Sequence, residues 1–441
     1  MRGVHSLHLD LWSSAEAACE VEGAAKPTAD GVCAALASLP TLRALTLRIG
    51  TRNQDHLRAV FVTALPALSQ LAHLDLSRNQ ISSDSAAALA PPLRRCTALT
   101  FLDLSFNELR ATGSQLLAPA LGRLSRLAHL GLSSNRLFDG AAALAPPLGL
   151  LTALTHCTLG HNSIIMQTLA PALGRLSRLA HLDLSSAHSH PAGAAAFAPS
   201  LRLLTALTFL DLSNCRMGAE GMQSLAPALG SLSQLAFLNL GCNDLHVAGA
   251  AALAPSLGLL TALTEFVMLG GKVGDAGAAL LAPALSRLSR LATLRFRVED
   301  FGAAGAAALA PTLGVLTALT LLDLWGNTFG DSGAESLAPA LRRLSRLANL
   351  NLDNTNIGTD GAAALAPALG ALTALTRLSL QDKCIGDDGL LHLVPALARL
   401  TVLAVFMLRC NDISDAGLAA FRAGVPACVF LACRPEWEQE W

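Results

Sequence analysis

The chain has 441 residues, of which 52% are apolar and only 14% are charged, and its formal net charge is −1. This balance argues against nucleic-acid binding through a basic face. The sequence contains no purely apolar stretch of about 18 residues that would span a membrane, and its first residues lack the apolar stretch of a secretory signal. The ten cysteines are scattered without a zinc-type pair of CxxC motifs, which favours reduced thiols in a cytoplasmic protein, or in a nuclear one.

A leucine-rich phrase recurs along the chain, in most places with a period of 28 residues. A fixed internal period indicates stacked modules that share one continuous core. We expect one continuous domain of about 15 repeats, in which residues 1–41 form a degenerate N-terminal repeat and cap, residues 42–415 the repeat array, and residues 416–441 a C-terminal cap. The regular repeats open at Leu42, Leu71, Leu99, Leu127, Leu154, Leu179, Leu207, Leu235, Leu263, Leu291, Leu319, Leu347, Leu375 and Leu403.

Each repeat opens with the pattern LxxLxLxxN, in which the alternation of the second and third leucines predicts a strand. The opening leucine is position 1, so that Leu99, Leu102, Leu104 and Asn107 occupy positions 1, 4, 6 and 9. Strand side chains alternate between two faces. Positions 3, 5 and 7 should therefore point away from the leucine core, onto an exposed face of the sheet.

The second half of each repeat is rich in alanine and leucine and predicts a helix, as in residues 361–375. Aspartates in the joins at 385–389 and 413–417 are expected to act as helix N-caps. Proline recurs within this stretch in thirteen repeats, inside LAPAL or a close variant. Because an interior proline costs roughly 3 kcal/mol, we predict either kinked helices or a turn followed by a helix with proline in its first turn. Near the C-terminus, AGLAAFRAG predicts a last helix and ACVFLAC a closing strand.

The repeat resembles the leucine-rich repeats of the ribonuclease-inhibitor type, which also occur in Ran GTPase-activating proteins and in nucleotide-binding immune receptors. The resemblance rests on LxxLxLxx(N/C) and extends from Leu42 to about Asp415. It implies an α/β fold, namely a leucine-rich repeat solenoid (horseshoe) with a parallel sheet on the concave face and kinked helices on the convex face.

Asparagine at position 9 should satisfy backbone groups of the adjacent turn. Gly271 and Glu299, in neighbouring repeats, are expected to make this asparagine ladder least regular. The asparagines are Asn79, Asn107, Asn135, Asn162, Asn243, Asn327 and Asn411, and the replacements are Ala187, Cys215, Gly271, Glu299, Thr355 and Lys383.

The exposed positions of the strands carry carboxylates, aromatic rings and arginines, which are residue types that suit a protein partner. The aspartates can equally be a common part of the repeat sequence that was inherited by duplication, without a role in binding. We expect one partner footprint that spans several repeats, centred near Phe209 and Phe237 or near Arg295 and Trp325. The candidate partner-binding residues are Phe101, Asp103, His129, His156, His181, Asp183, Phe209, Asp211, Phe237, Arg295, Arg297, Asp323, Trp325 and Arg377.

Three histidines occupy the same slot of consecutive strands, His129, His156 and His181. Neighbouring imidazoles could bind zinc, or they could weaken partner binding near about pH 6 as the rings become charged. The run can also be a product of duplication, and we predict no metal site and no cofactor.

The sequence predicts an interaction protein that is not an enzyme. It contains no GxxxxGK[ST] phosphate loop, no GxSxG elbow and no HExxH motif. An open sheet also lacks the pocket and oxyanion hole that a catalytic triad needs. We therefore expect a monomeric scaffold that binds a protein, with no nucleic-acid or membrane partner. The alternatives are an activator of a small GTPase and the sensor part of a larger immune-receptor-like assembly.

Overall fold

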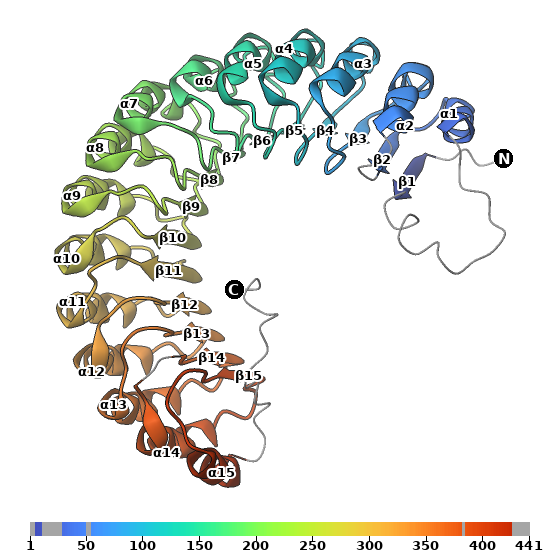
Figure 1. The fold of residues 1–441 in the computed structure, drawn as a ribbon. Coiled ribbons are helices and arrows are strands. Elements are labelled where there is room, and N and C mark those ends of the chain that lie inside the picture. Colours follow the sequence, from blue (N-terminus) through green and yellow to red (C-terminus); the bar gives the residue numbers. More distant parts are fainter. Residues whose placement is uncertain (1–4, 11–28, 50–53, 382–383, 426–441) are drawn as a thin grey trace, which may run out of the picture. The chain divides into compact units, whose positions relative to one another are not determined.

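The computed structural model describes residues 5–10, 29–49, 54–381 and 384–425 (Figure 1). It divides into two compact units, Met1–Cys215 and Arg216–Trp441. Both units alternate short parallel strands with helices, and in each unit the helices cover one side of the strands (Figure 1). The predicted leucine-rich repeat solenoid is confirmed at the level of the fold.

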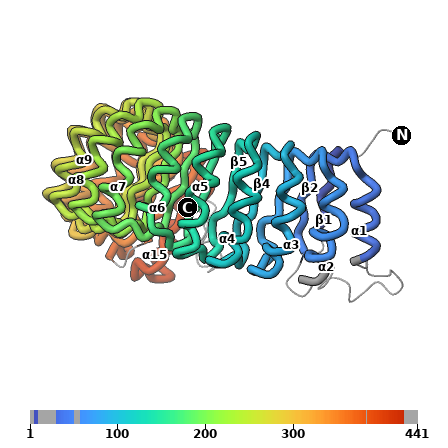
Figure 2. Tube along the Cα trace, turned by 90° about the horizontal axis from the view of Figure 1, so that it is seen from above, coloured from blue at the N-terminus to red at the C-terminus, as the bar shows by residue number. Residues whose placement is uncertain are grey.

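In the first unit, each strand pairs in parallel with the strand of the next repeat, in register at equivalent positions. The helices follow one another in the same order (Figure 2). The strands are β1 (Ser6–Asp10), β2 (Ala44–Arg48), β3 (His73–Asp75), β4 (Phe101–Asp103), β5 (His129–Gly131), β6 (His156–Thr158), β7 (His181–Asp183) and β8 (Phe209–Asp211). The helices are α1 (Ala29–Ala37), α2 (Gln54–Ala59), α3 (Ser83–Leu93), α4 (Arg110–Leu121), α5 (Ala141–Leu148), α6 (Met166–Leu173) and α7 (His190–Leu201), with a π-helical segment at Val60–Ala64 and 3₁₀ turns at Leu65–Ala67 and Phe138–Gly140.

The second unit repeats the same parallel, in-register pairing. Its strands are β9 (Phe237–Asn239), β10 (Glu265–Leu269), β11 (Thr293–Arg297), β12 (Leu321–Asp323), β13 (Asn349–Asn351), β14 (Arg377–Ser379) and β15 (Val405–Met407). Its helices are α8 (Gly218–Leu229), α9 (His246–Leu257), α10 (Gly274–Leu285), α11 (Ala303–Leu313), α12 (Gly330–Leu341), α13 (Thr359–Leu369), α14 (Gly386–Leu397) and α15 (Asp415–Gly424).

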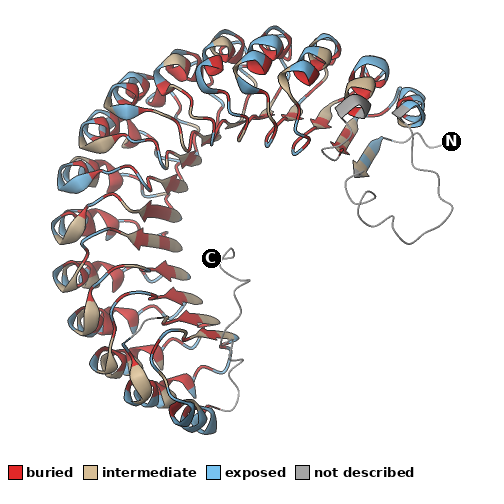
Figure 3. Ribbon diagram, in the orientation of Figure 1, coloured by how far each residue is buried: buried red, intermediate tan, exposed pale blue. Residues whose placement is uncertain are grey.

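The core lies between the strands and the helices, where the leucines of both halves of the repeat meet (Figure 3). In the repeat that contains β4, Leu99, Leu102 and Leu104 are fully buried, as are Leu117 and Leu121 of α4. One strand and one helix cannot hide this apolar surface alone, and stacking on the neighbouring repeats completes its burial.

The helices are shorter than the sequence predicted. The stretch expected to be helical to residue 375 forms α13, which ends at Leu369, and residues 370–375 form the turn that leads to β14. Proline lies in the last turn of the α-helix, as Pro119 does in α4, so the prediction of a helix with proline in its first turn is wrong for the α-helices. Pro66 differs, because it lies at the start of the 3₁₀ turn Leu65–Ala67. Pro119 is exposed, and the carbonyl four residues before it, which loses its hydrogen bond, belongs to the exposed Gln115. Water can bind this carbonyl, which lowers the cost of the proline.

The predicted asparagine ladder is confirmed. Asn107 Oδ1 accepts hydrogen bonds from the backbone N–H of Asn79 (3.0 Å) and of Ile81 (2.9 Å). Its amide nitrogen donates to the carbonyls of Leu76 (3.0 Å) and Leu104 (2.8 Å). One buried side chain therefore satisfies backbone groups of two consecutive repeats, which are costly to bury without partners.

The predicted aspartate N-caps are wrong, because Ile385 and Ser414 hold those positions and the aspartates lie in the first helical turn. An aspartate of this turn instead caps the next helix along the chain. Asp331 of α12 accepts the N–H of Gly358 (2.6 Å) and of Gly361 (2.9 Å) at the start of α13. Glycine is needed at position 361, since a Cβ there would collide with the Asp331 carboxylate.

The same arrangement recurs every 56 residues. Asp275 accepts the N–H groups of Gly302 (2.7 Å) and Gly305 (2.8 Å) before and within α11. Asp387 accepts the N–H of Ser414 (2.8 Å) just before α15. The capping aspartate thus recurs in every second repeat here, and each one joins its own helix to the start of the next helix along the chain.

The terminal predictions are tested only in part. The last predicted helix is confirmed as α15, and the predicted closing strand at residues 427–433 lies outside the described residues. The backbone departs from the repeat at Gly271, which has a φ of 102° at position 9, whereas the φ of 74° at Gly270 matches the positive φ found at position 8 of other repeats.

Candidate partner-binding surface

The aspartates of position 5 have a local structural role. Asp103, Asp183 and Asp211 each accept the backbone N–H of the serine two residues later, at 2.8, 2.9 and 2.8 Å. This side-chain bond closes the turn at the end of the strand. The turn alone accounts for these aspartates, which remain predicted partner contacts without independent support.

Six aromatic rings at position 3 form a continuous stack in the first unit, which we term the ring ladder. His73, Phe101 and His129 stack with centroids 3.9 and 4.2 Å apart. Centroid distances of 5.6 and 5.5 Å join His129, His156 and His181, and the Phe209 ring lies 3.8 Å from that of His181. In-register parallel strands lie about 4.8 Å apart, so pairing alone brings the rings face to face.

Burial among other rings favours the neutral form of the inner histidines. It lowers the pKa of His181 from 6.5 to about 4, helped by the charges of His156 and His129 and opposed by Asp211. Burial also lowers the pKa of His129, with His156 and His73 acting in the same direction and Asp103 against it. The nearby aspartates stabilise a proton on either ring less than burial and the neighbouring histidines destabilise it.

The ring ladder has poor geometry for a shared metal ion. The planes of His129 and His156 differ by 31° and those of His156 and His181 by 22°, so the in-plane lone pairs of neighbouring rings lie in nearly parallel planes and do not meet at one point between them. A zinc ion needs lone pairs that converge on a point about 2 Å from each nitrogen. Within the part of the chain that the structure describes, no three His, Cys, Asp or Glu residues are grouped to hold a metal.

The strands with five residues all lack an aspartate or asparagine at position 5. They are β1, β2, β10 and β11. In β10 and β11, Val267 and Arg295 occupy this position and offer no acceptor for the turn. The parallel pairing of β10 with β11 continues for two more residues, through the pairs Met268↔Phe296 and Leu269↔Arg297. This extension places Arg295 and Arg297 on the same face of one regular strand.

Arg297 packs on a tryptophan of the next repeat. Its guanidinium carbon lies 3.8 Å from the centroid of the Trp325 ring, a cation–π contact. Gly326 has a φ of +72°, and a Cβ at that residue would come within 2.7 Å of Arg297 Nε. The glycine therefore makes room for the guanidinium, while Trp325 remains 37% exposed. We term Arg295, Arg297, Asp323, Trp325 and Arg377 the Arg–Trp patch.

The Arg–Trp patch also contains a buried carboxylate. Asp323 pairs in register with Arg295 and accepts the backbone N–H of Trp325 (3.1 Å). Burial raises the pKa of Asp323, against the opposing effects of the Trp325 hydrogen bond and of the Arg295 and Arg297 charges. Arg377 lies two strands further, in register with Asn349.

Within each unit, the structure brings some of the candidates together. The ring ladder holds Phe101, His129, His156, His181 and Phe209 in the first unit. Phe237 belongs to the second unit and is half-buried beside Glu265, and a centre formed by Phe209 and Phe237 stays a prediction.

Two features of the sheet face were missed in the sequence. His73 begins the ring ladder and occupies the same position 3 as its other members, which is a signal that the sequence does contain. Arg48 forms a two-pronged ion pair with Asp75, through distances of 3.0 and 2.7 Å. That contact joins different repeats and depends on side-chain reach, so the repeat pattern does not predict it.

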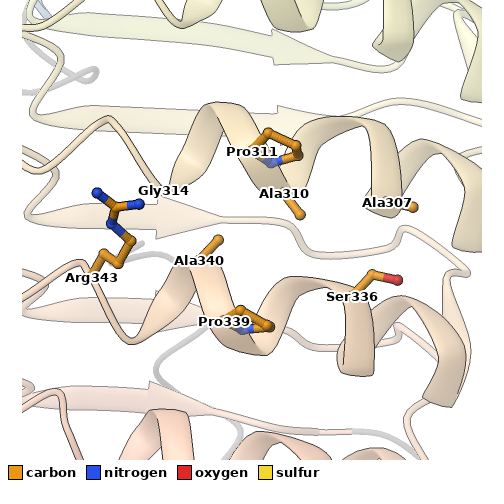
Figure 4. A pocket seen from close by; sticks show the side chains of 8 residues that line it. All are labelled: Ala307, Ala310, Pro311, Gly314, Ser336, Pro339, Ala340 and Arg343. Atoms are coloured by element: carbon orange, nitrogen blue, oxygen red, sulfur yellow. The ribbon is translucent and has the colours of Figure 1, made fainter.

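The helix side of the second unit carries a depression of about 390 Å³ between α11 and α12 (Figure 4). Pro311 and Pro339 line it together with small residues, and Arg343 lies at one end. The lining offers a single charged group, which makes it a weaker candidate than the sheet face.

None of the helices in the described ranges has the length and apolar character needed to cross a membrane. Four segments, residues 70–90, 95–118, 204–226 and 315–338, match a family model described as a leucine-rich repeat. No curated protein matches the sequence.

Solved structures show the same architecture. An internalin from Listeria monocytogenes is 22% identical, with a TM-score of 0.53, and the match covers 86% of this chain and 93% of that chain. A leucine-rich repeat protein from Leptospira interrogans is 17% identical, with a TM-score of 0.57, over 96% of this chain and 99% of that one. At these identities the likeness concerns the fold, and the ribonuclease-inhibitor subtype stays a prediction.

Proposed function

We propose that this leucine-rich repeat protein is a scaffold without enzymatic activity that binds a protein partner on the exposed face of its strands. Leucine-rich repeat proteins generally act in protein–protein interaction. The observation that carries the proposal for this chain is the Arg297–Trp325 pair, in which a planar cation rests on an accessible indole. Tryptophan and arginine dominate the energetics of known protein interfaces.

Rigidity supports the same function. The Arg–Trp patch lies on paired strands whose leucines are buried and whose turns are held by side-chain hydrogen bonds. Side chains that are already ordered lose little conformational entropy when a partner binds. Such a surface can make several contacts at once without first reorganising.

A charge-reversal experiment tests the proposal. The double variant R295E/R297E should lower the recovery of at least one partner about tenfold or more in affinity capture from the native organism, followed by quantitative mass spectrometry. Tenfold corresponds to only about 1.4 kcal/mol, a modest loss for two hot-spot arginines.

The matched control is R287E/R290E, which makes the same change of charge at two exposed arginines in the turn after α10. It should leave recovery unchanged. Circular dichroism and a thermal melt establish that both variants fold. Equal recovery of every partner by the wild type and R295E/R297E would reject the Arg–Trp patch as the binding surface.

Finer assignments are part of the proposal. We infer a monomeric, cytoplasmic protein that needs no cofactor and binds neither nucleic acid nor membranes. A role as activator of a small GTPase, or as the sensor part of a receptor-like assembly, stays a prediction from the resemblance of the repeats. Measuring GTP hydrolysis by a Ran-type GTPase with and without the chain separates an activator from a scaffold.

A further inference from the structure

The Arg–Trp patch contains a buried donor without an acceptor among the residues that the structure describes. The Nε of Arg295 is this donor, and neither the Arg295 nor the Arg297 side chain forms a hydrogen bond or ion pair with any described residue. A buried donor without a partner is destabilising. Asp323 accepts the N–H of Trp325 and interacts with the two arginines through its charge alone, without a hydrogen bond to either.

Stacking leaves Arg297 free to bind an anion. Its guanidinium lies over the Trp325 ring, so the N–H groups at its edge remain available in the plane of the fork. Guanidinium groups pair with carboxylates through two parallel hydrogen bonds. The patch therefore offers two arginine forks that are held in place before any ligand arrives.

The spacing of the two arginines indicates an extended ligand. Arg295 and Arg297 are alternate residues of the regular strand β11, about 6.6 Å apart along the sheet face. An extended peptide presents its residues i and i+2 on one face at the same interval. Two acidic side chains separated by one residue would meet the two forks.

A peptide fits the patch better than a polyphosphate does. The Oδ1 of Asn349 is a buried acceptor without a hydrogen-bond partner, on the second strand after β11. A peptide backbone supplies N–H donors for such an acceptor, whereas a phosphate chain supplies none.

We propose that the Arg–Trp patch binds an extended acidic segment of a partner protein, with carboxylates at alternate residues paired to Arg295 and Arg297 and with Trp325 as the supporting platform. This inference rests on the proposed function and deepens it, because it specifies the chemistry of the partner.

The test is a direct binding measurement on the full chain by fluorescence anisotropy. The probes are a labelled ten-residue peptide of alternating Glu and Thr, its Lys–Thr counterpart, and a ten-residue oligodeoxythymidine. We expect the acidic peptide to bind and the basic peptide not to bind. R295Q/R297Q should weaken binding of the acidic peptide about tenfold or more, and R287Q/R290Q should have no effect.

The variant R297K separates fork recognition from general attraction. Lysine keeps the charge but lacks the planar fork, so binding should fall severalfold. Equal binding of the acidic peptide by the wild type and R295Q/R297Q, or tighter binding of the oligonucleotide than of the peptide, would overturn the inference.

A second control concerns the chain's own acidic sequence, in which Glu436, Glu438 and Glu440 also alternate. If E436Q/E438Q/E440Q tightens peptide binding, this segment is the occupant and the assignment to a partner is wrong. The capture experiment remains independent. If R295E/R297E loses partners in the capture experiment but the wild type does not bind the acidic peptide, this inference is wrong and the proposed function still holds.

Discussion

Replacing His181 by phenylalanine should remove a defined part of the acid sensitivity of the first unit. Burial and the neighbouring rings lower the pKa of His181 from 6.5 to about 4. A base whose pKa is lowered by folding stays neutral in the folded state while the unfolded chain takes up a proton. Its contribution to stability is therefore complete above about pH 6.5 and is lost as the pH falls from there towards about 4.

The size of the effect follows from the shift. A difference of about 2.5 pKa units corresponds to ~3.4 kcal/mol, and because the ring is only half-buried we halve this to ~1.7 kcal/mol for solvent screening. Phenylalanine keeps the stack, since Phe209 and Phe101 already occupy this slot of the ladder, but it takes up no proton. Relative to the wild type, H181F should gain about 1 kcal/mol or more of unfolding free energy between about pH 7.5 and pH 4.5.

Urea unfolding followed by circular dichroism at the two pH values measures this difference, and a proton NMR titration of the ring measures the pKa itself. The matched control is H246F, because His246 is exposed at the start of α9 and lies outside the ladder. The reasoning fails if H181F and the wild type lose the same stability on acidification, or if the ring titrates at an ordinary value.

Two further substitutions test how the repeats are joined. D331A should destabilise the chain by about 1–2 kcal/mol, because two N–H groups at the start of α13 lose their acceptor. Amide hydrogen exchange at Gly361 should become faster. The control D360A changes an exposed aspartate at the start of α13 and should lower stability less. N107L should lower the free energy of unfolding by about 3 kcal/mol or more in chemical denaturation, since it leaves buried backbone groups without hydrogen-bond partners. N107C should be tolerated better, because Cys215 fills the same position and donates to the Leu184 carbonyl. Equal losses of stability for the two variants would contradict this account.

The strands and the core could be predicted because the spacing of the leucines is compatible with only one arrangement, in which they all face the core. Alternation fixes which leucines turn inwards, and the recurrence of Asn107 and its equivalents fixes where the turn satisfies its backbone. The helix ends were harder. Residues 370–375 have helical composition, but the chain must turn there to reach β14, and composition does not reveal that requirement.

The contacts that join different repeats could not be predicted from the pattern of one repeat. Asp331 looks like a local N-cap, yet its acceptor oxygen serves glycines 27 and 30 residues away. Recognising this requires the offset between adjacent helices, which is a property of the stacked array. The contact between Arg297 and Trp325 has the same origin, because a longer strand and a glycine with positive φ bring the two side chains together.

The fold itself shows which exposed residues call for a partner. Asp103 and its equivalents close a turn, so their presence is explained without a ligand. Arg295 stands in the same position and cannot accept a hydrogen bond. Its strand is longer, and its Nε donor is buried without a partner among the described residues. The fold gains nothing from this exchange that an aspartate would not supply. Arg295 replaces the turn-closing aspartate, lowers stability and places a cation at the sheet face, and such a residue is best explained by binding. We therefore expect the partner to bind at the Arg–Trp patch and not along the row of aspartates.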